Sequence, residues 1–429
     1  MKRYSEYKDS GVKWIGEIPR HWECRKLKTL LLSPLQYGAN ASGVPYSEHL
    51  PRYIRITDIT LEGKLKHSDK LSLSNEDAAK YILKDKDILF ARSGASVGKT
   101  FLYKKEYGLS AFAGYLIKAE LGKELIPELL FYFTQSDIYE SWKNGIFIQS
   151  TIQNIGADKY SQLQIALPPL PEQQAIVTYL DTKVAKIDEY ISIAEKKIAA
   201  LEELKQTIIA EAVTRGIHKD VPMKDSGVKW IGMIPEHWKI RKMKFVFKER
   251  SEKGYPNEPV LSATQSNGVI PQSMYENRVV VVNKGFENLK LVCKGDFVIS
   301  LRSFQGGIEY AYYRGIISAA YTILTKSAEF LNEGYVKNLF KSHPFVQLLK
   351  TCVTGIREGQ NINYSLLRDK YIPVPPLAEQ QEIVTYIEAK VANINQLCQA
   401  ERSQIEKLKE YKQRLISDVV TGKVKVTND

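Results

Sequence analysis

The segment PPLPEQQAIVTYLDTKVAKI, residues 168–187, recurs later in the chain as PPLAEQQEIVTYIEAKVANI, residues 375–394. Its prolines end any strand that precedes it, because proline fixes φ and cannot donate a ladder hydrogen bond. The glutamate that follows, Glu172 or Glu379, falls in a first helical turn, where negative charge suits the helix dipole. We therefore predict that one long helix begins near residue 172 and a second near residue 379.

Apolar residues continue after each segment at alternating spacings of three and four, which is the pattern of a coiled-coil seam. The predicted helices run from about 172 to 215 and from about 379 to 421, roughly 66 Å each at ~1.5 Å per residue. Each seam needs a partner, and the nearest is the other copy. We expect an antiparallel intramolecular coiled coil; the alternative is a pair of ordinary bundle helices. The seam positions are Val177, Leu180, Val184, Ile187, Ile191, Ala194, Ile198 and Leu201, and Val384, Ile387, Val391, Ile394, Cys398, Glu401, Ile405 and Leu408.

A second repeat precedes each helix. Residues 9–28, DSGVKWIGEIPRHWECRKLK, match residues 225–244, DSGVKWIGMIPEHWKIRKMK, at fifteen of twenty positions. The stretches between these landmarks share little identity, so we call them the first and second variable domains. We predict an α+β protein in which two α/β domains are separated by two long antiparallel helices, as a pseudo-two-fold tandem repeat. The predicted divisions are residues 1–166, the helical spacer 167–216, residues 217–373, and a second spacer with a tail, 374–429.

Each terminus also resembles one half of the join between the repeats, so we expect the two ends of the chain to lie close together. The four repeated tryptophans are expected to pack the domains against the helices; the alternative is stacking on nucleic-acid bases. They are Trp14, Trp22, Trp230 and Trp238.

The totals exclude several classes of protein. The 429 residues suffice for two or three domains, and no apolar run approaches the ~20 residues of a membrane helix. The first residues have no apolar core of the kind that a signal peptide needs. Four scattered cysteines fit neither a disulfide framework nor a zinc site, and the six histidines show no paired-ligand spacing. We expect a cytoplasmic, metal-free protein.

Positive charge lies outside the predicted helices. The formal charge is +12, while residues 172–215 and 379–421 together hold 15 acidic and 12 basic residues, which leaves +15 elsewhere. Such an excess favours a polyanionic partner. Residues 131–154 and 354–365 mix basic, aromatic and amide side chains. In DNA complexes, basic and amide side chains contact phosphates and the edges of nucleobases. The alternative is that the aromatic residues serve core and loop packing.

The segment RSGASVGKT, residues 92–100, looks like a nucleotide-binding loop. A Walker loop needs four residues between its glycine and the GK pair, and this segment has three. Its counterpart LRSFQGGIEY, residues 301–310, has no lysine. We therefore predict no nucleotide site. A glycine-rich turn with flanking cations can still bring the backbone close to a DNA phosphate, and the alternative is a plain tight turn.

The chain resembles the specificity subunit of type I restriction–modification systems. The resemblance covers essentially the whole chain and rests on the doubled DSGVKWIGxIPxHW, on DILFARSGASVGKT at residues 87–100, and on the doubled PPLxEQQ with its heptads. It implies two target-recognition domains, each reading one half of a split DNA sequence, with the helices setting the gap. The second copy departs from the pattern at residues 302–304, where RSF replaces RSG.

The resemblance also implies partners. Two methyltransferase subunits and motor-nuclease subunits would carry S-adenosylmethionine, ATP and magnesium, so we expect no catalytic residue and no cofactor in this chain. The predicted partner-binding residues are Glu172, Gln173, Glu379 and Gln380, although these also suit a helix start. The rival hypotheses are an enzyme fused to its own recognition domains, a stand-alone DNA-binding protein, and a coiled-coil scaffold for proteins only.

The predicted contacts to double-stranded DNA share polar or basic side chains in loops of the variable domains. They are Arg92, Ser93, Lys99, Lys143, Asn144, Gln149, Gln153 and Asn154 in the first domain, and Gln265, Asn267, Arg302, Ser303, Gln305, Arg357, Gln360 and Asn361 in the second.

Overall fold

The computed structural model describes residues 2–60, 62–66, 68–147, 154–275, 285–355 and 361–426, without the side chain of Ala95. The chain forms two compact units. Unit 1 comprises Met1–Ala194 with Ser403–Asp429, and unit 2 comprises Glu195–Arg402. Each unit therefore contains one variable domain and a segment of each long helix. The four predicted parts are consecutive segments of the chain, whereas unit 1 combines two segments that pack together and unit 2 begins and ends within the long helices.

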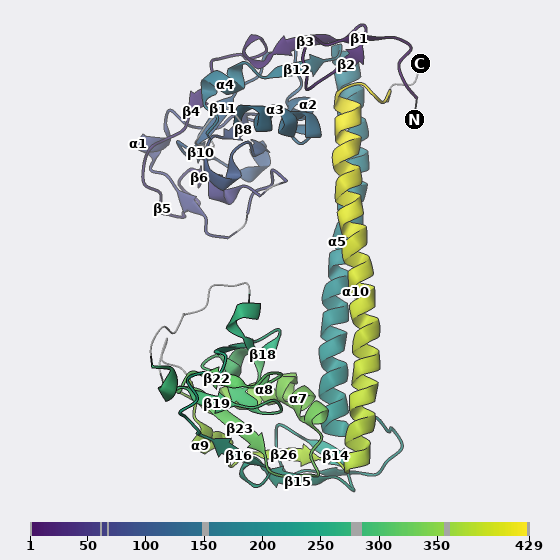
Figure 1. Ribbon diagram of the computed structural model, residues 1–429. Coiled ribbons are helices and arrows are strands. Elements are labelled where there is room, and N and C mark those ends of the chain that lie inside the picture. The colour runs from purple at the N-terminus through teal and green to yellow at the C-terminus, as the bar shows by residue number, and fades with distance from the viewer. Residues whose placement is uncertain are drawn as a thin grey trace. The chain divides into compact units, whose positions relative to one another are not determined.

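The two long helices have the predicted bounds to within two residues. Helix α5 spans Leu170–Arg215 and helix α10 spans Leu377–Val420. Within each unit a segment of α5 lies alongside a segment of α10 (Figure 1). In unit 2, Lys197 pairs with Glu401 at 2.5 Å and Lys205 donates to Asn395 at 3.3 Å. Partner numbers fall on one helix as they rise on the other, so the predicted antiparallel pairing is confirmed.

The predicted seam is also confirmed, because its positions are buried or half-buried. Leu180 is fully buried, and Ile387 and Cys398 are nearly so. Glu401, the charged exception, keeps 15 % of its side chain exposed and neutralises Lys197. The seam therefore tolerates a carboxylate because the facing helix supplies its counter-ion.

The variable domains are built around matching four-stranded sheets. The sheet of unit 1 has the order β4 (Gln36–Tyr37), β11 (Leu116–Ala119), β8 (Ile88–Ala91), β9 (Thr100–Leu102). That of unit 2 has the order β16 (Phe247–Arg250), β23 (Thr322–Lys326), β20 (Phe297–Ile299), β21 (Glu309–Tyr310). All neighbours in both sheets are antiparallel. Two domains with little sequence identity thus share the strand order and directions of this sheet, as expected of a tandem repeat.

The remaining elements of each unit surround this sheet. In unit 1 they are β1 (Tyr7–Asp9), β2 (Glu17–Pro19), β3 (Glu23–Lys26), β5 (Val44–Pro45), β6 (Arg52–Ile54), β7 (Leu71–Ser72), α1 (Asn75–Ala78), β10 (Ser110–Phe112), α2 (Pro127–Phe133), α3 (Asp137–Phe147), α4 (Ala157–Ser161) and β12 (Gln164–Leu167). In unit 2 they are β13 (Met223–Asp225), β14 (Met233–Pro235), β15 (Lys239–Lys242), β17 (Leu261–Thr264), β18 (Gly268–Pro271), β19 (Lys290–Val292), α6 (Ser303–Gly306), β22 (Gly315–Ile317), α7 (Glu333–Lys341), α8 (His343–Lys350), β24 (Val353–Thr354), β25 (Asn361–Ile362), α9 (Tyr364–Leu367) and β26 (Tyr371–Val374).

A buried glutamine at the start of α5 joins the first variable domain to the helix. The Gln173 side chain is 1 % exposed and makes three hydrogen bonds. It accepts from the N–H of Ile126 at 2.9 Å and donates to the carbonyls of Glu124 at 2.8 Å and Pro168 at 2.9 Å. All its donors and acceptors are therefore used, which a buried amide requires.

The second copy repeats this joint on α10. Gln380 is fully buried, accepts from the N–H of Asn332 at 2.8 Å, and donates to the carbonyls of Phe330 at 2.9 Å and Pro375 at 2.8 Å. The repeated EQQ thus has a structural cause, since each glutamine holds the chain just before α2 or α7 against a long helix.

The repeated tryptophans pack as expected. Trp22 is fully buried and donates from Nε1 to Glu172 at 2.9 Å, and Trp238 is 1 % exposed. Trp14 meets Phe133 edge-on at 6.4 Å, and Trp230 meets Phe345 at 5.7 Å between ring centroids. All four rings lie against their own unit, and base stacking by them is not supported.

The first and last described residues of unit 1 lie together, as expected from the join between the repeats. Lys2 and Lys425 form an antiparallel bridge, with the N–H of Lys425 donating to the carbonyl of Lys2 at 2.9 Å. Among the residues described above, no helix is both long and apolar enough to cross a membrane.

Replacing Gln173 by alanine should destabilise the protein by about 3 kcal/mol, because three hydrogen bonds are lost and a buried N–H is left unsatisfied. Urea unfolding of the full chain measures the change. Gln174→Ala is the control, since Gln174 is exposed and should change stability by less than about 0.5 kcal/mol. Equal effects of the two substitutions would contradict the role of the buried joint.

Candidate nucleic-acid interface

The glycine-rich segment of unit 1 connects two strands. It leaves β8 at Ala91, forms a single 3-10 turn at Gly94–Ser96, and enters β9 at Thr100. A phosphate-binding Walker loop instead leads from a strand into a helix whose N-terminus faces the phosphates. The prediction that this segment is no nucleotide site therefore agrees with its place in the fold. We name residues 92–99 loop 1.

Arg92 begins loop 1 with unused hydrogen-bonding capacity. Its guanidinium lies over the ring of Tyr37 at 4.9 Å, a cation–π contact, and its buried Nε has no acceptor among the described residues. Beside it, Ser93 forms an isolated antiparallel bridge with Asn154. Three predicted residues, Arg92, Ser93 and Asn154, are thus brought together although sixty residues of chain separate the last two.

The far end of loop 1 packs on α3. The hydroxyl of Tyr139 donates to the carbonyl of Gly98 at 2.9 Å, and the Lys143 side chain runs directly past the Gly98 Cα. Lys143 is only 14 % exposed and pairs with Glu140 at 2.6 Å. The structure therefore places Lys143 at the loop, but its charge is already partly neutralised.

Lys99 adds a second cation at the end of loop 1. Burial lowers its pKa, the neighbouring charge of Lys66 lowers it further, and Glu62 opposes both. Neither Lys66 nor Lys99 has an ion-pair partner within the described ranges. A bound anion would relieve this repulsion, which is the electrostatic property expected of a phosphate contact.

The equivalent segment of unit 2, residues 300–308, lies between β20 and β21, and we name it loop 2. It contains helix α6 where loop 1 has a 3-10 turn. Gln265, at the tip of the β17–β18 hairpin, touches Gly306 closely, and Lys341 donates to the carbonyls of both, at 3.3 Å and 3.0 Å. One lysine thus joins the hairpin tip to loop 2. Because loop 2 leaves β20 as loop 1 leaves the equivalent strand β8, the structure agrees with the correspondence of the two segments in sequence.

The remaining predicted residues divide into three groups. Asn144, Asn267, Arg302, Gln305 and Asn361 are exposed, as are Gln265 and Asn154. Ser303 is 1 % exposed and its Oγ accepts from the N–H of Ser300 at 2.8 Å, so its side chain holds the turn and does not face a ligand. Gln149, Gln153, Arg357 and Gln360 lie outside the described residues.

Several residues at the two loops were not predicted. In unit 1 they are Tyr37, Lys66 and Tyr115, whose ring is 63 % exposed and whose carbonyl accepts from the N–H of Arg92 at 3.1 Å. In unit 2, Tyr312 lies beneath Lys337 at 5.0 Å and against Gly268. Tyr37 lies in β4 and the other tyrosines and Lys66 lie in turns or loops, and no local motif marks them in the sequence.

A buried carboxylate stands at the base of each loop strand. Asp87 accepts from the N–H of Lys84 at 2.8 Å, and Asp296 accepts from the N–H of Cys293 at 2.7 Å. Burial raises the pKa of both carboxyls above the usual 3.8, although these N–H groups oppose the shift. Each therefore favours folding most below its ordinary pKa, and this contribution is lost as pH rises through the raised value. Their symmetry points to a structural role.

The predicted partner-binding residues are buried. Glu172 and Glu379 are each 8 % exposed, and they pair with His21 at 2.9 Å and His237 at 2.7 Å. Gln173 and Gln380 use their hydrogen bonds within their own units, as described above. These contacts explain the repeated residues without a partner, and the four side chains offer a partner almost no surface.

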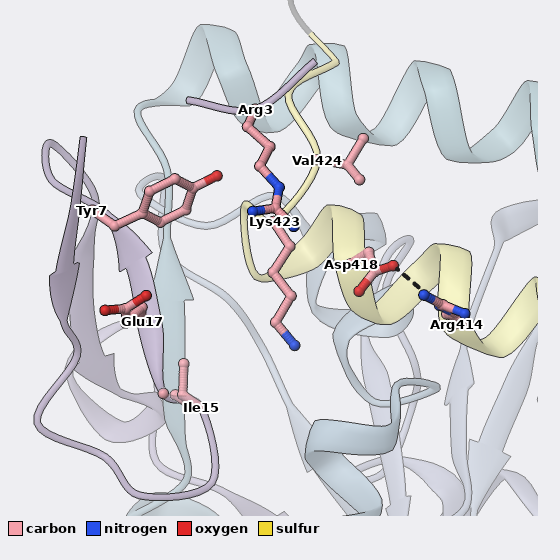
Figure 2. A pocket seen from close by; sticks show the side chains of 9 residues that line it. Arg3, Tyr7, Ile15, Glu17, Arg414, Asp418, Lys423 and Val424 are labelled. Carbon is pink, nitrogen blue, oxygen red and sulfur yellow. Dashed lines mark ion pairs between the residues drawn. The ribbon is translucent and has the colours of Figure 1, made fainter. Parts of the chain in front are cut away.

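A pocket of about 680 Å³ lies in unit 1 beside β1, β2 and the end of α10 (Figure 2). Its lining mixes the signs of charge, with Arg3, Glu17 and Lys423 beside the ion pair of Arg414 and Asp418 at 3.7 Å. Arg414 is 82 % exposed. Exposed charges of both signs select no ligand of one sign, and the pocket is not part of loop 1.

Gly307, which follows α6 in loop 2, has a φ of +89°, and a Cβ there would lie 2.3 Å from the carbonyl oxygen of Phe340. Gly307→Ala should destabilise the chain by about 3 kcal/mol, from left-handed strain and from overpacking against α7. Gly94→Ala in loop 1 is the control, since its φ is +71° with nothing within 4 Å. We expect about 1 kcal/mol there from strain alone. Urea unfolding that ranks the two equally would contradict the close packing.

The chain is similar to type I restriction enzyme specificity subunits over nearly its full length. It is 27% identical to the putative MjaX specificity subunit of Methanocaldococcus jannaschii, covering 98% of each chain. It is 22% identical to the EcoKI specificity subunit of Escherichia coli, covering 95% of this chain and 90% of the relative.

Solved structures show the same fold. A chain from a structure on complex assembly and conformational transition of the type I R-M system superposes with a TM-score of 0.69 at 17% identity, covering 95% of this chain and 99% of that chain. The HsdS subunit of Thermoanaerobacter tengcongensis gives 0.51 at 19% identity, with 95% and 98% covered. The family model for the type I restriction modification DNA specificity domain matches residues 53–203 and again residues 235–407. The chain therefore belongs to the family of type I restriction–modification DNA specificity proteins.

Proposed function

We propose that this chain is the DNA sequence-specificity subunit of a type I restriction–modification complex, in which each variable domain binds one half of a bipartite target. The observation that carries the proposal is the placement of loops 1 and 2. Both leave the third strand of matching four-stranded sheets and begin with an equivalent arginine, Arg92 or Arg302. Loop 1 continues through a 3-10 turn to Lys99, whereas loop 2 continues through α6 with Gln305. A shared arginine with otherwise different side chains is what two readers of unlike half-sites would use.

The binding strength should come largely from charge. Arginine and lysine neutralise phosphates, so affinity for DNA should fall steeply with salt, while arginine and glutamine discriminate base edges. The two half-sites also act together, because binding of one domain makes the contact of the other intramolecular. A protein-only scaffold would show no such salt dependence, and this separates the rival from the proposal.

Genome-wide adenine methylation in the host, with and without the gene, tests the proposal directly. We expect one split motif with two unlike halves to lose methylation when the gene is absent. An unchanged methylome, in cells where the chain co-purifies with an active methyltransferase, would overturn it. The motif found this way supplies the DNA used in the binding experiments below.

Substitutions at the two loops should act on different halves of the target. Arg92→Ala should reduce discrimination about tenfold in one half only, and Arg302→Ala in the other, because a good arginine–base contact is worth ~1–3 kcal/mol. Competition binding at fixed salt, with single changes in each half, measures this. Arg414→Ala, an equal loss of charge on α10, should alter neither half. An equal loss in both halves from Arg92→Ala would count against separate readers.

The same proposal assigns the catalytic steps to other subunits. Methyltransferase subunits with S-adenosylmethionine, and motor-nuclease subunits with ATP and magnesium, would assemble on this chain in the cytoplasm. The dock that we propose for the methyltransferase uses exposed apolar side chains of the helices rather than the buried EQQ residues. Tyr190 and Leu397, equivalent positions of the two helices, are 62% and 49% exposed.

Each unit contributes one such pair to this dock. Tyr411 accompanies Tyr190 in unit 1, and Leu204 accompanies Leu397 in unit 2, each 48% exposed. The antiparallel register given by Asp188 with Lys412 and by Lys205 with Asn395 puts the members of each pair level. Two equivalent apolar pairs fit two copies of one partner.

Tyr190→Glu should remove one methyltransferase subunit and Leu397→Glu the other, because a buried carboxylate without a partner opposes docking. Native mass spectrometry of the purified complex should show the number per chain fall from two to one for either variant. Ala199→Glu adds the same charge at another exposed position of α5 and should leave two. Retention of two subunits by both dock variants would place the dock elsewhere.

A further inference from the structure

The first variable domain contacts the long helices at several levels along α5. The contact nearest the start of α5 is the Gln173 joint, which unit 2 repeats with Gln380. Another contact centres on Asp188, fifteen residues further along α5, or roughly 22 Å at ~1.5 Å per residue. We call it the Asp188 contact. A domain that contacts the helices at separated points rotates less easily relative to them than a domain with one contact.

Asp188 binds two lysines that come from different parts of unit 1. Its Oδ1 pairs with Lys412 of α10 at 2.6 Å, and its Oδ2 pairs with Lys64 of the variable domain at 3.3 Å. The Lys412 and Asp188 side chains are only 15 % and 30 % exposed, so solvent screens this pair incompletely. One carboxylate thus connects the variable domain to both helices.

Glu62 completes the charge balance of this network. Burial alone would raise its pKa, but the Thr60 hydroxyl and the charges of Lys412 and Lys64 outweigh burial and lower it. The two lysines therefore face two carboxylates, Asp188 and Glu62. This balance favours one arrangement of residues 62–66 beside the helices.

Two further hydrogen bonds join the variable domain to the helices between the Gln173 joint and Asp188. The Tyr132 hydroxyl of α2 donates to Asp181 of α5 at 2.5 Å, and burial followed by this carboxylate raises the Tyr132 pKa, so the donor stays protonated. The N–H of Asp137, at the start of α3, donates to Ser417 of α10 at 2.8 Å. The Asp188 contact is therefore the furthest of these contacts from the start of α5.

Unit 2 carries different residues at the equivalent helix positions. Asn395 replaces Asp188, Glu388 replaces Asp181, and Ala210 replaces Ser417. Asn395 still accepts from Lys205, the equivalent of Lys412, but no variable-domain residue pairs with it among those described. The second domain instead binds α10 near its start, where Asn332 donates to Gln381 at 2.8 Å. Within the described part of the chain, the contact between this helix position and a variable domain thus belongs to unit 1 alone.

We propose that Asp188 is a positioning residue that fixes the orientation of the first variable domain on the helices, and thereby makes the complex strict about the gap between the two halves of its target. The proposal rests on the proposed function. Asp188 itself would touch no DNA. It acts through Lys64, whose loop would otherwise move with the domain and shift where loop 1 meets its half-site.

Asp188→Asn tests this, because it installs the residue that the second copy already has. The full chain is bound to DNA carrying both halves of the methylated motif at the natural gap and at one base pair more or less. The preference for the natural gap should fall, but by no more than about fivefold, because the Lys64 side chain is 67 % exposed and exposed ion pairs contribute little. Glu189→Gln is the matched control, an exposed neighbour without a described ion pair, and it should keep the wild-type preference.

A double substitution separates positioning from general damage. Lys64→Met and Asp188→Asn should each relax gap preference, and the double variant should be no worse than either, because both remove the same contact. Base discrimination within each half should stay unchanged in all three. Wild-type gap preference in Asp188→Asn, or additive losses in the double variant, would overturn the proposal.

A measurement without DNA distinguishes failure of this inference from failure of the proposed function. The N–H of Lys64 donates to Thr60 at 3.2 Å and that of Lys66 to the carbonyl of Asp58 at 2.8 Å. Hydrogen exchange at these amides should accelerate in Asp188→Asn and not in Glu189→Gln. Unchanged exchange would overturn the positioning role, whereas accelerated exchange in a chain that ignores the target would overturn only the assigned function.

Discussion

The structure depends on one buried amide in each copy of the repeat. Gln173 and Gln380 each satisfy one backbone N–H and two backbone carbonyls that would otherwise be buried without partners. Because the amide uses all three bonds at once, the segment before α2 or α7 has one position relative to the helix start. Everything built on that segment, including the sheet and its loop, inherits this position. A single side chain therefore couples the spacer to the domain in both copies.

On this common frame the two loops are free to differ. The sheets agree in strand order, and the buried carboxylates Asp87 and Asp296 close equivalent turns at the base of the loop strands. Loop 1 is a short turn with a stacked arginine, whereas loop 2 contains a helix and is tied to a hairpin by Lys341. A constant sheet with different loops would suit the proposed recognition of two unlike half-sites with one architecture.

The sequence was sufficient to predict the long helices, their antiparallel pairing and the place of both loops. Periodic apolar residues and repeated landmarks are local signals, and the burial of Leu180 and Ile387 follows from them. Side-chain detail was not predictable in the same way. Ser303 had the right chemistry for a DNA contact but turns inward to Ser300. Tyr37 lies under Arg92 because β4 and β8 belong to one sheet, on either side of β11. The EQQ residues were assigned to a partner because most of their internal contacts are distant in sequence, as Gln173 with Glu124 and Glu172 with His21 show.

The difference between Asp188 and Asn395 has a genetic meaning. Aspartate and asparagine codons differ at one base, so a single transition could exchange a charged helix position for a neutral one. On the proposed role, that exchange would alter how strictly two half-sites must be spaced while leaving every DNA-facing residue untouched. Gap tolerance and base preference would then be separately heritable traits. A lineage could broaden the set of sites that it protects without evolving a new recognition loop.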